Sequence, residues 1–159
     1  MVSPIGDFAI RKDHMTEPTL DPTPESIALI DIAALFKKRW HTNLPEKGAP
    51  KNGAAIAVLN DLEQLGRFVE HMIICRDAPP YFRKRLHPEY KAGRPELEPE
   101  EKEQRRWLFQ QITALGYTIA SAEGYEADDV IATLAKSYGA WCTDVRIVGN
   151  DKDLDQCIT

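Results

Sequence analysis

Three short apolar runs of this sequence are each followed closely by an aspartate, and a fourth segment has three acids within four residues. Asp31 follows the first run and Asp77 the second. Carboxylates only a few ångströms apart repel one another strongly unless a cation lies between them. Hard divalent metal ions with oxygen ligands, Mg²⁺ or Mn²⁺, are the simplest such cations. The acids in question are Asp31, Asp77, Glu126, Asp128, Asp129, Asp151 and Asp153.

These acids would meet if the apolar runs were neighbouring strands of one parallel sheet. Short, apolar, β-branched runs are typical of strands buried on both faces, and the working site of an open parallel sheet lies at the carboxyl ends of its strands. Strands alternate with helical patterns along the chain, which predicts an α/β domain with a mainly parallel central sheet flanked by helices. The expected strands are residues 27–31, 71–76, 117–120 and 144–148, and the expected helices are residues 33–40, 54–69, 100–115 and 125–138.

The size and composition of the chain indicate one globular domain, residues 26–159, with a disordered N-terminal tail over residues 1–25. No apolar stretch reaches the roughly 20 residues that span a bilayer, and the N-terminus has no secretory signal pattern. We therefore expect a cytoplasmic protein without membrane contact. Cys75, inside an expected strand, is interpreted as a core residue. No zinc or disulfide pattern links Cys75, Cys142 and Cys157.

A basic segment lies between the second expected strand and the third expected helix. The net charge of −5 argues against a nucleic-acid-binding surface over the whole chain, but residues 81–94 hold five basic residues against one acid. A local basic patch beside an acidic metal site is consistent with a phosphodiester substrate. The plain alternative is a solvated, mobile loop. The basic residues are Arg83, Lys84, Arg85, Lys91 and Arg94.

Each acidic segment also has an ordinary structural explanation when it is taken alone. Asp31 and Asp77 could cap strand ends, and residues 150–153 could form a polar turn. Acids in the first turn of a helix are favoured by the helix dipole, but three acids in residues 126–129 exceed what the dipole requires. The joint pattern is therefore what indicates a site.

Three motifs, in order and at matching spacing, resemble the 5′-3′ exonuclease and flap-endonuclease family. They are residues 81–95 (YFRKRLHPEYKAGRP), 124–134 (GYEADDVIATL) and 149–156 (GNDKDLDQ). The likeness is strongest to the amino-terminal nuclease domain of bacterial DNA polymerase I and runs from about residue 27 to residue 157. It implies a resolvase-like or PIN-like nuclease domain with a basic helical arch over about residues 80–104.

The resemblance implies that Mg²⁺ or Mn²⁺, as two ions, is held by the seven carboxylates named above. Two metal ions can activate a water and stabilise both the attacking and the leaving oxygen of a phosphodiester. The expected core ligands are Asp77, Glu126, Asp128, Asp129 and Asp151, with Asp31 and Asp153 in supporting positions.

The arch motif of the family matches Tyr90, Lys91 and Arg94. Lys91 and Arg94 would hold the scissile phosphate and offset its developing charge, and Tyr90 would stack on an unpaired base. The implied substrate is DNA with a free or flapped 5′ end, and the sequence indicates no specific protein partner. Salt-dependent attraction of the DNA backbone would come from Arg83, Lys84 and Arg85.

The sequence departs from the family pattern in three places. Ile32 and Ala33 follow Asp31, where the family usually has glycine and a small polar residue, and Arg76 stands where an apolar residue is usual. The family also continues beyond the last motif, with further metal-binding aspartates and a helix-turn-helix-like module that grips duplex DNA. Because this sequence ends at Thr159, we expect it to lack part of the second metal site and the duplex anchor.

Three other functions share parts of this pattern. A catalytically silent domain would bind branched or single-stranded DNA, but binding alone has no use for mutually repelling carboxylates. A ribonuclease of the related small nuclease class would have the same sheet and acids without the arch. A phosphatase is a weaker alternative, because acids and a metal do not choose between a phosphate monoester and a diester.

Overall fold

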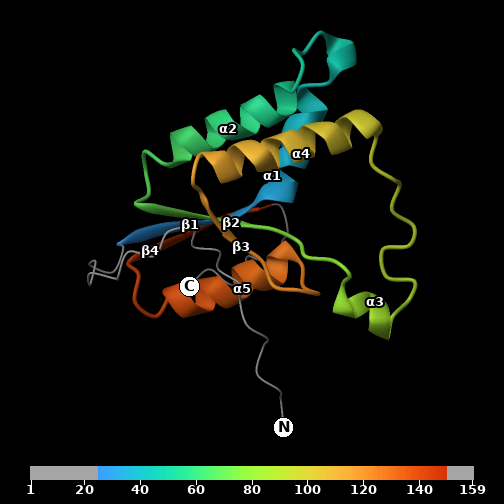
Figure 1. Cartoon of the computed structure of the whole chain (residues 1–159). Helices are drawn as coiled ribbons and strands as arrows, with labels where there is room; N and C mark the ends of the chain where they lie inside the picture. Colours follow the sequence, from blue (N-terminus) through green and yellow to red (C-terminus); the bar gives the residue numbers. More distant parts are fainter. Residues whose placement is uncertain (1–24, 150–159) are drawn as a thin grey trace.

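A four-stranded parallel sheet forms the middle layer of the chain in the computed structural model, which describes residues 25–149 (Figure 1). The strands are β1 (Ser26–Asp31), β2 (His71–Cys75), β3 (Thr118–Ala120) and β4 (Asp144–Val148), close to the expected ranges. The expected tail, except Glu25, and the acids Asp151 and Asp153 lie outside the described residues.

The strands lie in the order β3-β2-β1-β4, and all three pairings between them are parallel. In register, Asp31 at the end of β1 lies beside Cys75 at the end of β2, and Ile30 lies beside Val148 near the end of β4. The carboxyl ends of the strands therefore share one edge of the sheet. The sequence-based expectation of an α/β domain with a parallel sheet is confirmed.

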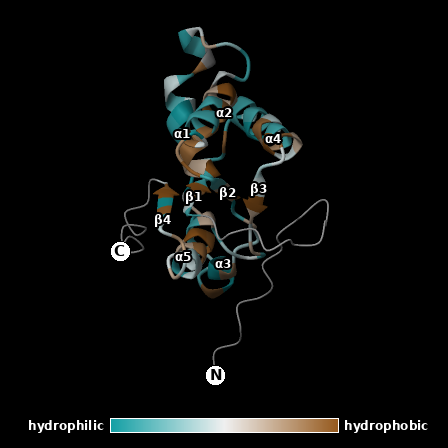
Figure 2. Cartoon of the chain, turned by 90° about the vertical axis from the view of Figure 1, so that its left-hand side faces the viewer, coloured by the Kyte–Doolittle hydropathy of each residue, from teal (hydrophilic) through white to brown (hydrophobic). Residues whose placement is uncertain are grey.

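Helices cover both faces of the sheet (Figures 1 and 2). On one face lie α1 (Ile32–Thr42), α2 (Gly53–Leu65) and α4 (Pro99–Ala114), and on the other lies α5 (Ala127–Tyr138). A short helix, α3 (Phe82–Leu86), stands to one side, and a 3₁₀ turn spans Pro45–Lys47. Within residues 25–149, no helix is long and apolar enough to cross a membrane.

Alternate residues of β1 support two separate hydrophobic cores. Ala28 and Ile30 are buried with the helices α1, α2 and α4, whereas Ile27 and Leu29 are buried with α5. This alternation follows from the two-residue period of a strand, which points successive side chains to opposite faces. Full burial of one such side chain stabilises the fold by about 1.5–3 kcal/mol.

Helix ends differ from the expected ranges by a few residues, for local reasons. Asp31 caps α1, because its Oδ1 accepts a hydrogen bond of 3.0 Å from the backbone N–H of Ala34. The second helix ends at Leu65 rather than near residue 69, since Gly66, a weak helix former, follows it. The last helix begins at Ala127 rather than residue 125, because Glu126 is its N-cap.

Candidate metal and phosphate site

Three backbone hydrogen bonds hold the loop after β2 against the loop before α5. The N–H of Ala78 donates to the carbonyl of Tyr125 (3.0 Å), that of Gly124 to Ala78 (2.7 Å), and that of Phe82 to Gly124 (2.9 Å). Gly124 has a φ of +83°, a backbone conformation that glycine adopts at little cost. The rings of Phe82 and Tyr125 also pack together, with centroids 5.0 Å apart. We call this pairing the clasp, and it brings the end of β2 to the start of α5.

Asp77 lies just before the clasp and bridges two segments that are far apart in sequence. Its Oδ1 accepts a hydrogen bond of 2.7 Å from the backbone N–H of Ala127, and its Oδ2 accepts one of 3.0 Å from the hydroxyl of Tyr81. Burial and the neighbouring charge of Asp77 raise the pKa of Tyr81 to about 12, so this hydroxyl stays a donor at neutral pH. Sequence reasoning did not single out Tyr81. The only sequence feature that could have indicated this contact is a tyrosine four residues after an acid at a strand end.

Glu126 and Asp129 form a reciprocal cap at the start of α5. The Glu126 side chain accepts from the backbone of Asp129, and Asp129 Oδ2 accepts from the backbone N–H of Glu126 at 3.1 Å. This arrangement is a capping box, which satisfies two otherwise unpaired backbone donors. Glu126 is nevertheless buried, with 7% of its surface exposed. A buried carboxylate is costly unless it is paired and hydrogen-bonded.

The basic segment supplies the partners that this pair of acids needs. Arg83 donates to Glu126 at 2.8 Å and makes two hydrogen bonds, of 2.7 and 2.5 Å, to the two oxygens of Asp129. The hydroxyl of Tyr90 donates to Glu126 Oε2 at 2.7 Å, and Lys91 forms an ion pair with Glu126 Oε1. In the structure the basic segment therefore lies directly on the acids that open α5.

Lys91 is held among charges of both signs. Its backbone has a φ of +60°, which is uncommon for a residue other than glycine. Burial, followed by the nearby charge of Arg94, lowers the pKa of Lys91, while Asp77 and Asp128 act in the opposite direction. The hydrogen bond to Asp129 is the main cause that raises the pKa of Arg83, and the charge of Asp128 acts in the same direction. Arg94 and Asp128 thus lie within electrostatic reach of the same cluster.

The remaining expected residues are not all drawn into this cluster. Asp31 lies at the same edge of the sheet, at the end of β1 and as the cap of α1. Lys84 and Arg85 are exposed on α3, and no described carboxylate forms an ion pair with either. Between residues 25 and 149, no group of three or more His, Cys, Asp or Glu is arranged to hold a metal ion. Outside that range, Asp151 and Asp153 are not described.

The chemistry of the acids suits a hard divalent cation. Asp77, Glu126 and Asp129 offer carboxylate oxygens, the ligands that Mg²⁺ and Mn²⁺ prefer. Glu126 and Asp129 already bind cationic groups, the guanidinium of Arg83 and the ammonium of Lys91. A site that attracts protein cations so closely has the charge to attract a metal ion as well.

A family model described as the 5′-3′ exonuclease, N-terminal resolvase-like domain, matches residues 26–159. This chain belongs to that family. The resemblance seen in the three sequence motifs is therefore confirmed, and so is the resolvase-like fold. The boundaries of the domain and the roles of the individual site residues stay predictions.

DNA polymerase I from several bacteria contains segments similar to this 5′-3′ exonuclease domain. The enzyme of Pseudomonas aeruginosa is 36% identical over 138 residues, covering 83% of this chain and 15% of the relative. That of Treponema pallidum is 35% identical over 146 residues, covering 84% of this chain and 14% of the relative. The chain thus spans about one seventh of the length of these polymerases.

Solved structures of bacteriophage T5 proteins share the fold. A T5 protein co-crystallised with metal ions aligns with a TM-score of 0.63 at 22% identity, covering 84% of this chain and 52% of the other. The T5 flap endonuclease, solved as a pseudo-enzyme-product complex with DNA and metal ions, aligns with a TM-score of 0.61 at 20% identity over the same shares. Both alignments agree with the parallel sheet described above.

Proposed function

We propose that this domain hydrolyses DNA phosphodiester bonds at a free or flapped 5′ end and depends on divalent metal ions. The observation that carries the proposal is the meeting of Asp77, Glu126 and Asp129 with Arg83 and Lys91 at the carboxyl edge of the sheet, in a chain of this nuclease family. The metal ions and DNA in the T5 structures support it.

In this proposal, carboxylates at the sheet edge would hold two ions of Mg²⁺ or Mn²⁺. When bound, such ions activate water and stabilise the attacking and leaving oxygens. Tyr81 and the backbone of Ala127 orient Asp77 by donating to both of its oxygens. The core ligands are Asp77, Glu126, Asp128, Asp129 and Asp151, with Asp31 and Asp153 in support.

The basic segment has a second task in the same proposal, which is to bind the substrate. Lys91 and Arg94 hold the scissile phosphate, and Tyr90 stacks on an unpaired base. Arg83 and Lys91 are paired with Glu126 in the chain alone. With a metal ion on the carboxylates, Arg83 and Lys91 would be available to bind a phosphate of the substrate. Lys84 and Arg85, exposed on α3, attract the DNA backbone at longer range.

The deciding experiment is cleavage of a labelled 5′-flap DNA with Mg²⁺ and with EDTA, for the parent chain and for Asp128→Asn. Glu123→Gln is a matched control, because Glu123 is exposed just before the cluster and makes none of its contacts. We expect cleavage that needs metal, is lost in D128N and persists in E123Q. Equal cleavage by D128N and E123Q would overturn the assignment of the acids. No cleavage by the parent, with DNA still bound, would favour a binding domain instead.

A further inference from the structure

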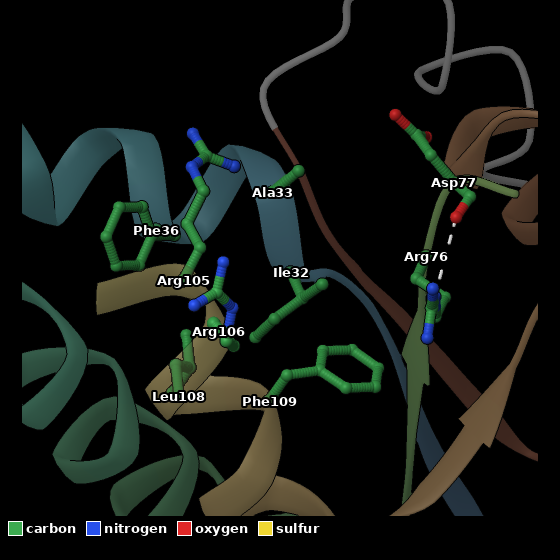
Figure 3. A pocket seen from close by; sticks show the side chains of 9 residues that line it. All are labelled: Ile32, Ala33, Phe36, Arg76, Asp77, Arg105, Arg106, Leu108 and Phe109. Carbon is green, nitrogen blue, oxygen red and sulfur yellow. Dashed lines mark hydrogen bonds between the residues drawn. The ribbon is translucent and has the colours of Figure 1, made fainter. Parts of the chain in front are cut away.

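A cavity of about 290 Å³ adjoins the candidate site on the side away from α5. It lies between the start of α1, the end of β2 and one side of α4 (Figure 3). Asp77 lines this cavity and also belongs to the candidate site, so the two share one residue. The other lining residues are Ile32, Ala33, Phe36, Arg76, Arg105, Arg106, Leu108 and Phe109.

Two lining arginines are stacked on aromatic rings. The guanidinium of Arg76 lies 4.4 Å from the ring centre of Phe109, and that of Arg105 lies 4.7 Å from the ring centre of Phe36. Figure 3 shows Phe109 reaching from α4 toward Arg76, which directly follows β2. Flat rings and flat guanidinium groups are the surfaces on which nucleic-acid bases stack.

The cavity carries an excess of positive charge. Arg105 is paired with Glu101 at 2.6 Å. Across residues 25–149, by contrast, no carboxylate side chain forms an ion pair with Arg76 or Arg106. Arg76 uses its Nε to donate to the backbone carbonyl of Asp77 at 3.4 Å, which leaves its remaining N–H groups for an anion.

We propose that this cavity binds one nucleotide of a single-stranded segment of the substrate. Arg76 and Arg106 hold its phosphate, and its base packs against Phe109. The volume of about 290 Å³ lies just below the range for ligand pockets, about 300–1,000 Å³, so the cavity is suited to one nucleotide and not to a folded partner. The inference rests on the proposed function for the nature of the strand, and it adds a subsite beside the acids.

This subsite gives a function to residues that the metal site does not use. Arg76 is exposed at a strand end and has no role in the sheet core. Arg106 lies thirty positions later in the sequence, on another element, yet lines the same cavity. Planar guanidinium groups recognise phosphate by paired hydrogen bonds.

The test measures binding in EDTA, so that no metal chemistry contributes. The probe is a 5′-phosphorylated oligonucleotide with a fluorophore at its 3′ end, followed by anisotropy over a range of salt concentrations. We expect Arg76→Gln with Arg106→Gln to weaken binding about tenfold or more. The dependence of log K on log salt should become shallower by about 0.7 for each lost phosphate contact.

A matched pair of substitutions controls for net charge. Lys37→Gln with Lys38→Gln removes two exposed charges from α1 at positions that do not line the cavity. We expect this double variant to bind within about twofold of the parent. Equal losses in the two double variants, or no loss in R76Q/R106Q, would overturn the proposal.

Phe109→Leu separates base stacking from a merely structural role of the ring. Leucine keeps an apolar side chain beside Leu108 and Ile32 but has no ring face. We expect F109L to bind an ordinary strand several-fold more weakly than the parent and an abasic strand equally well. The same loss for both strands would show a structural effect and would contradict the proposed contact with the base.

The binding assay tests the subsite and the cleavage assay tests the nuclease proposal, so either proposal can be contradicted without the other. If the parent does not cleave flap DNA but R76Q/R106Q still loses binding in EDTA, the subsite stands and the nuclease proposal falls. If the parent cleaves and R76Q/R106Q binds as tightly as K37Q/K38Q, the nuclease proposal stands and the subsite falls.

Discussion

Glu126 shows how one carboxylate can serve both the fold and the chemistry. Its side chain caps α5, and it also contacts Arg83, Tyr90 and Lys91. Because it is buried, its negative charge must always have a positive partner. In the proposed nuclease, metal ions and the basic segment are alternative partners for the same charge.

Replacing Arg83 with Gln should therefore strengthen metal binding by the chain alone. The substitution removes the cation that contacts both Glu126 and Asp129 and leaves their charge for the metal. We expect Mn²⁺ affinity, measured by calorimetry without DNA, to rise by roughly tenfold, equivalent to about 1.4 kcal/mol. Arg85→Gln is the control, since Arg85 is exposed on the same short helix. Unchanged or weaker Mn²⁺ binding in R83Q would show that the Arg83 guanidinium and the metal ion do not compete for these carboxylates.

The thiol of Cys75 should make stability fall at high pH. Burial raises its pKa to about 12 in the folded chain, whereas an unfolded thiol ionises at about 8.5. Its contribution is fully present below about pH 8.5 and is lost as the pH rises toward 12, at up to about 1.4 kcal/mol per pH unit. Urea unfolding at pH 8, 9.5 and 10.5 in reductant measures this decline.

Cys75→Ala should flatten that decline, and Cys142→Ala should largely keep it, because Cys142 is less buried. A decline of the same slope in C75A would contradict the assignment to this thiol. Full burial of Cys75 confirms its interpretation as a core residue.

The clasp is the local element that turns distant sequence motifs into one site. Asp77 and Glu126 meet because residues 78–82 pair with residues 124–125 through backbone hydrogen bonds. Gly124 takes the positive φ that this pairing needs, and an alanine there would be strained although it would have ordinary space.

Gly124→Ala should lower the free energy of unfolding by about 1–2 kcal/mol and also weaken Mn²⁺ binding. Two other glycines provide controls. Gly116, with a φ of +77° and open space, lies after α4 and outside the candidate site, so G116A should lose similar stability and keep its metal affinity. Gly93 has open space without a positive φ, so G93A should change neither. Equal metal affinity in G124A and G116A would argue against a role for the clasp.

At the level of single elements, the strands and their ends could be predicted from the sequence, whereas the tertiary contacts could not. The apolar runs before Asp31 and Asp77 predicted β1 and β2 within about a residue, because burial on both faces leaves a clear pattern. The pairing of Arg83 and Lys91 with Glu126 has no such pattern. A basic segment can face water, DNA or its own chain, and only the folded path of residues 81–95 decides between them.

Across the whole molecule, a single sheet shared by two cores links the stability of both faces. Ile112 is fully buried with α1 and α2, and Ile131 is fully buried with α5 against the opposite face. The burial of both sheet faces under helices could be predicted from the fully apolar strands. The cavity beside Asp77 could not, since Arg76 and Arg106 belong to elements whose mutual placement the sequence leaves open.

Ile112→Ala and Ile131→Ala should each lower the free energy of unfolding by about 2–5 kcal/mol. Because β1 contributes to both cores, we expect each variant to unfold in a single transition, with coincident urea curves from tryptophan fluorescence and far-ultraviolet circular dichroism. Separate transitions in either variant would show that the two faces unfold independently.

The position of the basic segment outside the sheet allows its length and composition to change without disturbing the strands. The segment lies between the clasp and the start of α4, and no residue from Phe82 to Glu98 belongs to a strand. Insertions in such a segment cost little, because loop-closure entropy grows slowly with length. In an evolving lineage, its length and composition could change while the sheet stayed constant, provided that Arg83, Tyr90 and Lys91 continued to reach Glu126. Substrate choice could then diverge faster than the hydrolytic chemistry itself.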